Sequence, residues 1–215
     1  MTHIHSSYHW LDNLCARCPD LVDNRNQVVV ASPCPPNGLL VIGEAPGCDE
    51  DCKGEGFVGA AGKTLDRLLS ENDLERTNYG RANVCRCRPP NNRKPTTQEV
   101  KECLPFLANL ILEVRPKVIL AVGVTPTNIL CGSAGTLYSK IQTRQTSGNW
   151  HASQNLNLAN EGIRGAIEAV HYIVPMPHTS PLALNRKVDP KDSSSEHWEN
   201  IAKRQVALAV ELLRN

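Results

Sequence analysis

The fold is decided by residues 38–64, which read GLLVIGEAPGCDEDCKGEGFVGAAGKT. This stretch opens with GLLVIG (38–43), a short apolar run that is typical of a buried parallel strand. A glycine-rich loop follows, in which the backbone can approach a ligand closely. Leu65, Leu68 and Leu69 then share one face of a helical pattern. A strand, a glycine-rich turn and a helix in this order predict one unit of an α/β fold.

Three more apolar runs predict the partners of this strand. They are YGRANVC (79–85), which is the weakest, KVILAVG (117–123) and HYIVPM (171–176). Helical patterns lie between them, so strands and helices alternate. This alternation predicts a three-layer α/β/α sandwich with a central, mostly parallel four-stranded sheet. We expect a single domain over residues 1–215, because a chain of this length can enclose one core.

Two capping boxes mark expected helix starts. Thr96 with Glu99 precedes one helix, and Ser193 with Glu196 precedes the last one. Residues 132–165 are polar and poorly periodic, and we interpret them as a surface insertion. The apolar stripes of the two helices consist of Val100, Cys103, Leu104, Leu107 and Ile111, and of Trp198, Ile201, Ala209 and Leu212.

Charge and cysteine content narrow the class of protein. The chain has 23 Lys and Arg against 22 Asp and Glu, which excludes a polybasic nucleic-acid tail but not a local basic groove. Its nine cysteines are an odd number, and no apolar signal segment precedes them. No run approaches the roughly 20 apolar residues of a membrane span. We therefore expect a cytoplasmic protein, not bound to a membrane, with metal-bound and free thiols.

Four of the cysteines are spaced as metal ligands. Cys15 and Cys18 can bind one centre from a single turn, and Cys87 and Cys103 can complete a four-ligand cage from a distant segment. The later pair brackets CRPPNNRKPTTQEVKEC, a polar loop that leads into a helix. Such a cage would tie the N-terminal segment to this loop. The spacing itself allows either zinc or an iron–sulfur cluster.

Polar clusters follow three of the predicted strands. They are GEAPG (43–47), CRCRPPNNR (85–93) and PHTSP (177–181). Ligands of open α/β sheets bind beyond the carboxyl ends of the strands, so we expect these clusters to form one site. The segment GAAGKT (59–64) is not a P-loop, because Phe57 stands where that motif needs glycine. An aromatic residue in a glycine-rich loop suggests a stacking platform instead.

The pattern GEAPG…ED…G…FVG…AG, followed by NVCRCRPPNNRKPT and by a cysteine sixteen residues after Cys87, resembles the iron–sulfur uracil-DNA glycosylases, family 4 of their superfamily. The resemblance runs from Cys15 to about Arg186. It implies a 4Fe–4S cluster on Cys15, Cys18, Cys87 and Cys103. It also implies a DNA repair hydrolase that excises uracil from DNA and leaves an abasic site.

The chemistry of base excision suggests roles for the loop residues. The target nucleotide must be flipped into a pocket, where Phe57 would stack on it. The amide of Asn83 can donate to uracil O4 and accept from N3–H, a pattern that rejects cytosine. His178 matches the family's His-Pro-Ser motif, with Thr179 in place of proline, and would donate to uracil O2. Leu182 or Leu184 would fill the gap in the DNA.

The water nucleophile needs an orienting group. In the founding branch of the superfamily an aspartate stands where this chain has Ala45, and alanine cannot act as a base. The candidates are therefore Glu44 and Glu50, together with Asn92, which is implicated in the family. We favour Glu50 with support from Asn92. Glu44 has the alternative role of bracing the loop through backbone N–H groups.

Basic side chains flank the expected pocket and suit contacts to DNA phosphates. The other five cysteines have no assigned role, although a second metal site on Cys34, Cys48 and Cys52 or a redox-sensitive loop is conceivable. The proposed phosphate contacts are Arg88, Arg93, Lys94 and Arg186, with Arg86 and Lys187 beside them, and the unassigned cysteines are Cys34, Cys48, Cys52, Cys85 and Cys131.

Other functions compete with uracil excision. One is a glycosylase with broader specificity for deaminated bases such as hypoxanthine and xanthine. Another is a covalent uracil-DNA binding protein, which is disfavoured because RPPNNRKP contains no histidine. The third is an iron–sulfur electron-transfer protein, whose ligands would lie closer together in sequence. We expect a monomer that acts on single- or double-stranded uracil-containing DNA. The sequence carries no readable signal for a partner such as a sliding clamp.

Overall fold

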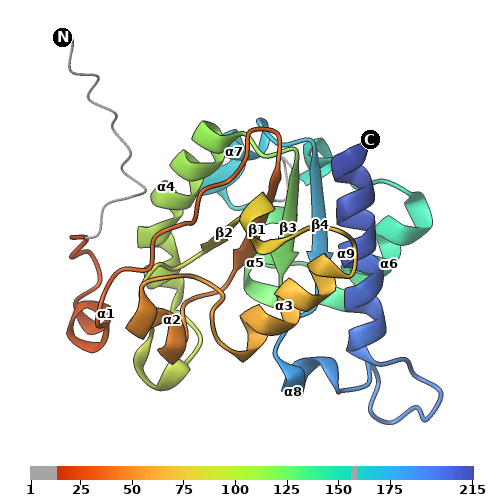
Figure 1. The fold of residues 1–215 in the computed structure, drawn as a ribbon, viewed down its shortest axis with the longest axis horizontal. Helices are drawn as coiled ribbons and strands as arrows, with labels where there is room; N and C mark the ends of the chain where they lie inside the picture. The colour runs from red at the N-terminus through yellow and green to blue at the C-terminus, as the bar shows by residue number, and fades with distance from the viewer. Residues whose placement is uncertain (1–13, 156–158) are drawn as a thin grey trace.

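The computed structural model describes residues 14–155 and 159–215, so residues 1–13 of the expected domain lie outside it. Its sheet has four strands in the order β2-β1-β3-β4, and each neighbouring pair is parallel. Each strand lies within a run that the sequence predicts, which confirms the expected sheet (Figure 1). The strands are β1 (Leu39–Gly43), β2 (Tyr79–Asn83), β3 (Val118–Val122) and β4 (Tyr172–Met176).

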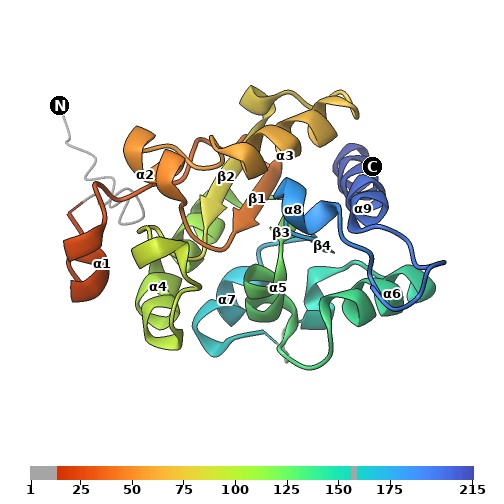
Figure 2. The ribbon, with the colours of Figure 1, turned by 90° about the horizontal axis from the view of Figure 1, so that it is seen from below.

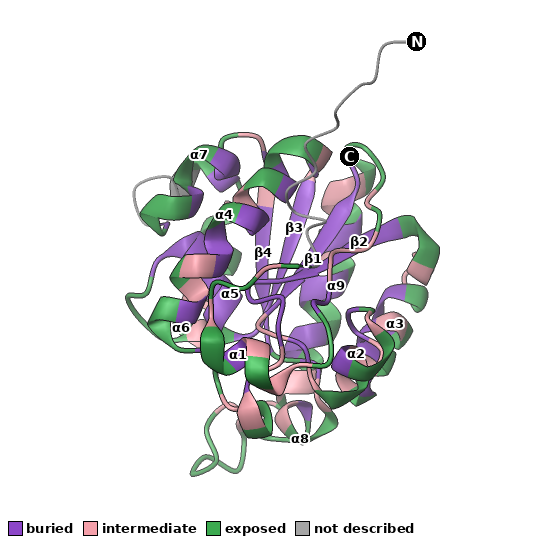
Figure 3. Cartoon of the chain, turned by 90° about the vertical axis from the view of Figure 1, so that its left-hand side faces the viewer, coloured by how far each residue is buried: buried purple, intermediate pink, exposed green. Residues whose placement is uncertain are grey.

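The sheet divides the hydrophobic core into two halves. Side chains alternate along the central strand β1, so Leu40 and Ile42 face one half whereas Leu39 and Val41 face the other. Every residue of β1 and β3 is buried, as the colours of Figure 3 show. Burial on both faces explains why these strands read as continuous apolar runs.

Helices cover both faces of the sheet, which confirms the three-layer architecture (Figure 2). Helices α3 and α9 pack on the Leu39 side, and α4, α5 and α7 pack on the Leu40 side. No helix among residues 14–155 and 159–215 is long and apolar enough to span a bilayer. The helices and short 3₁₀ turns are α1 (Pro19–Asn24), α2 (Cys48–Lys53), α3 (Ala60–Ser70), η2 (Arg76–Asn78), η3 (Pro90–Asn92), α4 (Thr97–Val114), α5 (Val124–Cys131), α6 (Leu137–Ser147), η4 (Ala152–Asn155), η5 (Glu161–Ile163), α7 (Arg164–Ile167), α8 (Pro181–Leu184) and α9 (Trp198–Arg214).

The two expected capping boxes have different outcomes. At α4, the Glu99 backbone N–H donates to Oγ1 of Thr96 at 3.2 Å, and Oε2 of Glu99 accepts from the Thr96 N–H at 2.7 Å, as predicted. The box expected at Ser193 and Glu196 is wrong, because α9 begins two residues after Glu196. The carboxylate of Glu196 pairs with Arg204 at 2.8 Å and so does not cap the helix.

Residues 132–165 are more than the surface insertion that we expected. Helix α6 lies among them and contacts β4. Ile141, Trp150 and Ile163 are buried, Trp150 in the Leu39 half of the core and Ile163 in the Leu40 half. These apolar residues are too widely spaced to give a periodic pattern, so their burial was not predicted from the sequence. Residues 156–158 of this segment lie outside the described part of the chain.

Candidate active site

A cavity of about 270 Å³ opens at the carboxyl edge of the sheet. Its walls come from the loops that follow β1, β2 and β4, so the expected convergence of the three polar clusters is confirmed. All the residues proposed for catalysis or base binding line it, except Leu182. The lining consists of Glu44, Ala45, Pro46, Gly47, Glu50, Phe57, Ala61, Gly62, Asn83, Pro89, Asn92, Arg93 and His178.

Gly43, the last residue of β1, lets an aromatic ring and an amide meet. A Cβ atom at Gly43 would lie 2.7 Å from Cζ of Phe57 and 2.5 Å from Oδ1 of Asn83. Both side chains are buried, each with 9% of its surface exposed. The ring and the amide therefore stand beside each other at the strand end, where they line the same cavity.

The backbone of Phe57 is held in an unusual conformation. Its φ angle is +60°, in the left-handed region that non-glycine residues rarely adopt. Arg76 donates to the carbonyl oxygens of Phe57 at 2.9 Å and Gly56 at 3.0 Å, and it pairs with Asp66 at 2.9 Å. Helix α3 packs so closely that a Cβ atom at Gly62 would lie 1.9 Å from the Phe57 oxygen. These contacts fix the ring at the cavity wall.

Glu50 braces the glycine-rich loop. Its carboxylate accepts the backbone N–H groups of Gly47 at 3.0 Å, Val58 at 2.9 Å and Gly59 at 2.8 Å. Two distant parts of the loop are thereby joined through one side chain. This is the bracing role that the sequence analysis considered for Glu44, and it competes with the water-orienting role that we favoured for Glu50.

Glu44 and His178 line the same cavity. Oε2 of Glu44 accepts a hydrogen bond from Oγ1 of Thr125, at the start of α5. The backbone N–H of Ser180 donates to Nδ1 of His178 at 3.1 Å, so the proton of the neutral ring resides on Nε2. The protein around the ring lowers the pKa of His178 below its ordinary value, and the charge of Glu44 opposes this shift. His178 is thus set up as a neutral N–H donor.

The loop between Arg88 and Arg93 is shaped by two left-handed residues. Asn91 has a φ angle of 52° and Asn92 one of 55°. Oδ1 of Asn92 accepts from Nε of Arg88 at 2.8 Å, which orients the amide at the cavity. Arg93 pairs with the buried carboxylate of Glu99 at 2.6 Å, so its charge is largely neutralised within the protein. This pairing weakens the phosphate contact that we expected for Arg93.

The other residues proposed to contact DNA separate into exposed and internal groups. Leu182 on α8 has 70% of its surface exposed, whereas Leu184 has 2%. Of the two candidate wedges, only Leu182 can enter DNA. Lys94 and Arg186 are exposed, as phosphate contacts must be. Nζ of Lys187 instead donates to the Ser193 carbonyl at 2.7 Å.

The burial of Arg86 contradicts the expectation that this side chain contacts DNA. Only 6% of its surface is exposed, and its guanidinium lies 3.6 Å from the centroid of the Phe106 ring. This stacking places Arg86 inside the protein, between β2 and α4, and is favourable for a cation that has lost its water. The sequence could not separate it from Arg88, which is partly exposed two residues later.

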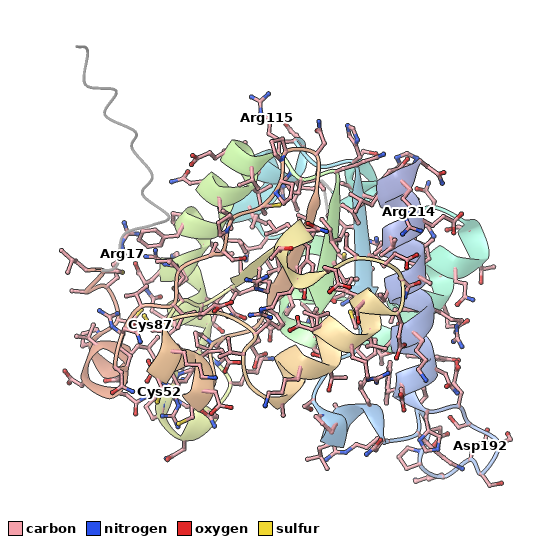
Figure 4. The ribbon with its side chains drawn as sticks, viewed as in Figure 1. Arg17, Cys52, Cys87, Arg115, Asp192 and Arg214 are labelled. Carbon is pink, nitrogen blue, oxygen red and sulfur yellow. The ribbon has the colours of Figure 1, made fainter. Side chains whose placement is uncertain are left out.

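Three of the four cysteines spaced as metal ligands, Cys15, Cys18 and Cys87, pack beside α1, where Figure 4 labels Cys87, whereas Cys103 lies on α4. Burial raises the pKa of the Cys18 thiol to about 11, and the charges of Cys103, Cys15 and Cys87 add to this rise. Nη1 of Arg25 donates to Sγ of Cys87 at 2.9 Å. In the part of the chain that the structure describes, no group of three or more His, Cys, Asp or Glu residues is placed to hold a metal ion.

The conceivable second metal site on Cys34, Cys48 and Cys52 is not formed. Cys34 packs against Gly80 at the amino end of β2. A Cβ atom added to Gly80 would lie 2.5 Å from the Cβ atom of Cys34. Cys48 and Cys52 are instead exposed on α2, which follows the carboxyl end of β1. The sheet therefore separates the expected ligands.

Two residues of the site were not found from the sequence. Arg76 lies in a polar segment without a motif, and only the fold brings it to the carbonyl of Phe57. Thr125 follows a predicted strand, so its position at a strand end was the available signal.

Comparison with known proteins places the chain in a family. The uracil DNA glycosylase superfamily model matches residues 33–202. A type-4 uracil-DNA glycosylase of Archaeoglobus fulgidus is 49% identical over 85 residues, which cover 40% of this chain and 43% of the relative. Another, of Pyrobaculum aerophilum, is 38% identical over 133 residues, which cover 62% and 67%. A third, of Thermotoga maritima, is 38% identical over 128 residues, which cover 60% and 66%.

The alignments therefore span between 43% and 67% of the lengths of these three relatives. The superfamily match is longer and extends from the segment before β1 into α9, so it includes all four strands and every loop around the cavity. On this match, the chain belongs to the uracil DNA glycosylase superfamily, and it is similar to the type-4 members.

Proposed function

We propose that this protein excises uracil from DNA by hydrolysing its N-glycosidic bond. The observation that carries this proposal is the placement of the Phe57 ring beside the Asn83 amide in a small cavity that His178 also lines. A base inside a duplex cannot reach such a cavity, so the target nucleotide must leave the stack first. The names of the type-4 relatives support the same reaction.

Recognition of uracil rests on Phe57 and Asn83. The flipped ring stacks on Phe57, whose position is fixed by its backbone contacts. The Asn83 amide donates to O4 and accepts from N3–H of uracil. Cytosine carries an amino group and an unprotonated N3 at these positions, so it would face donor with donor and acceptor with acceptor. Buried and held against Gly43, the amide has little freedom to adapt.

Bond cleavage requires stabilisation of the departing base. The C1′–N1 electron pair moves onto uracil, and negative charge develops at O2, where Nε2–H of His178 donates. A water molecule adds its oxygen to C1′ and loses one proton, which balances the proton that the departing uracil anion takes up. We assign Glu44, together with Asn92, to orient this water, because the Glu50 carboxylate already accepts three backbone N–H groups. Their charge and dipole also stabilise a cationic sugar.

DNA is held outside the cavity by a few exposed groups. Leu182 occupies the space that the flipped nucleotide leaves. Arg88, Lys94 and Arg186 contact phosphates. Arg93 makes only a minor contact, because its guanidinium already pairs with Glu99. With so few phosphate contacts and a net charge of +1, we expect moderate, salt-sensitive binding.

For the cofactor, we propose a 4Fe–4S cluster on Cys15, Cys18, Cys87 and Cys103. The donor set is chemically suitable, because the charges of Cys15, Cys87 and Cys103 all act on the Cys18 thiol, and Arg25 donates to the sulfur of Cys87. Four cysteine thiolates are the ligands that such a cluster would use. When bound, the cluster would cross-link the N-terminal segment to the loop that carries Arg88.

The experiment is incubation with oligonucleotides that contain one uracil, single- or double-stranded, followed by alkali. Excision is expected to give strand scission at the uracil position, whereas the same oligonucleotides with cytosine stay intact. Scission of oligonucleotides that contain hypoxanthine or xanthine, but not of those that contain uracil, would indicate that the protein excises another deaminated base. A denaturation-resistant adduct would indicate covalent capture instead. Intact strands and no adduct would contradict the proposed function.

A further inference from the structure

A second hollow lies on the other side of His178. It has a volume of about 640 Å³ and is lined by Val124, Tyr138, His178, Arg186, Trp198 and neighbouring residues of α5, α6, α8 and α9. His178 lines both this hollow and the uracil cavity. The two spaces are therefore adjacent, and of the residues that line the second one only His178 and Arg186 have a role in the steps proposed above. We call it the flanking groove.

The walls of the flanking groove are unusual for this chain. Aromatic residues are scarce, with three Trp and four Tyr in the sequence, yet one of each lines this groove. Tyr138 and Trp198 meet edge to face, with ring centroids 6.1 Å apart. Four large apolar side chains are exposed in the described part of the chain, and two of them, Val124 and Leu182, lie in or beside the groove.

The charges around the groove suit a nucleotide. Exposed Arg186 lines its wall, where a guanidinium can meet a phosphate. Asp189 also lines it, but Oδ1 of that residue accepts the backbone N–H of Lys191 at 2.9 Å and belongs to the following turn. Aromatic faces with a nearby cation are the combination by which proteins bind single-stranded nucleic acid without reading its sequence.

We propose that the flanking groove binds the base of a nucleotide next to the extruded uracil, on the same DNA strand. This inference rests on the proposed function. The neighbours of an extruded uracil remain covalently attached to it, and His178 lines both hollows, so the flanking groove lies within reach of an adjacent nucleotide. An unstacked neighbour then meets Tyr138 and Trp198, while Leu182 keeps it from returning to the stack. The groove thus favours single-stranded or locally melted DNA.

The test is a scan with abasic nucleotides. Single-stranded oligonucleotides carry one uracil, and an abasic tetrahydrofuran residue replaces one neighbour at a time on either side. Binding is measured by fluorescence anisotropy and excision by single-turnover kinetics. For the unmodified protein, we expect one neighbouring position at which loss of the base weakens binding about tenfold, the scale of one stacked base.

Variants of Tyr138 then assign this effect to the groove. Tyr138→Leu should weaken binding of intact DNA about tenfold and abolish the abasic effect, whereas Tyr138→Phe should keep both near normal because it retains the ring. Leu112→Ala, an exposed apolar position on α4, is the matched control. A flat scan, or an abasic effect of equal size in Tyr138→Leu, overturns the proposal and leaves the groove to another partner. Because binding is read separately, absence of excision would contradict only the proposed function.

Discussion

Nη1 of Arg76 donates to the carbonyl oxygen of Phe57 over 2.9 Å, so a residue just before β2 controls the backbone beneath the proposed stacking ring. The same guanidinium reaches the Gly56 carbonyl and the carboxylates of Glu55 and Asp66. It therefore stabilises a left-handed residue that the local sequence does not favour. Arg76 is a positioning residue, because it acts on the base through Phe57.

Arg76→Ala should weaken capture of uracil without removing a reacting group. Loss of charge-assisted hydrogen bonds of about 1.5–3 kcal/mol each releases the Phe57 backbone. We expect KM for uracil-containing DNA to rise about tenfold, with a smaller fall in kcat, and the protein to melt at a lower temperature. For Arg76→Lys, KM and the melting temperature should lie between those of Arg76→Ala and those of the unmodified protein. Arg67→Ala is the control, since its exposed ion pairs contribute little; equal effects in both variants would contradict the role.

Gly43→Ala should damage the site by overpacking. The added Cβ atom would lie 2.5 Å from the Asn83 amide oxygen and 2.7 Å from the Phe57 ring, so one of them must move. We expect a stability loss of about 1–3 kcal/mol, measured by urea unfolding, and at least a tenfold loss of excision. Gly165→Ala is the matched control, because open space surrounds that position in α7. Full activity in Gly43→Ala would refute the tight packing.

The pH dependence of excision should follow His178. Its pKa lies below the ordinary value of 6.5, because the surrounding protein desolvates the charged ring, although part of the side chain is exposed. The neutral donor is thus present at pH 7, and kcat/KM should fall only as the pH drops through the lowered pKa. Glu44→Gln removes the charge that raises this pKa, so the acid limb should move to still lower pH, whatever the height of the profile. A shift of the acid limb to higher pH would contradict this electrostatic arrangement.

The cysteine set can be tested by metal content. Cys87→Ser or Cys103→Ser should lose most of about four bound irons per chain and the visible absorbance of the cluster, and should unfold at a lower temperature. Cys52→Ser, at an exposed position on α2, should retain both. Iron content unchanged in Cys87→Ser would exclude this ligand set, whatever the activity of the variant.

Much of the fold followed from the sequence because its signals are local. The runs in β1 and β3 are apolar throughout because both faces of the sheet are covered, and the Thr96 box caps α4 with its own neighbours. The loops converged as expected, since parallel strands end at one edge. What escaped prediction depends on distant partners: Arg86 stacks on Phe106, Glu196 pairs with Arg204, and Arg76 reaches a carbonyl 19 residues away.

The different roles of Glu44 and Glu50 could not be predicted from the sequence for the same reason. Both carboxylates lie in one loop and read alike in sequence. Only the fold brings the N–H groups of Val58 and Gly59 to Glu50 and the hydroxyl of Thr125 to Glu44.

The central claim, that Asn83 and His178 select and release uracil, is tested most directly by single-turnover excision from a single-stranded oligonucleotide that contains one uracil. Asn83→Ala and His178→Ala should each slow excision by about 10²-fold or more, the scale for a lost transition-state donor, while melting temperature and iron content stay near those of the unmodified protein. Excision at an unchanged rate in either folded variant would contradict the account.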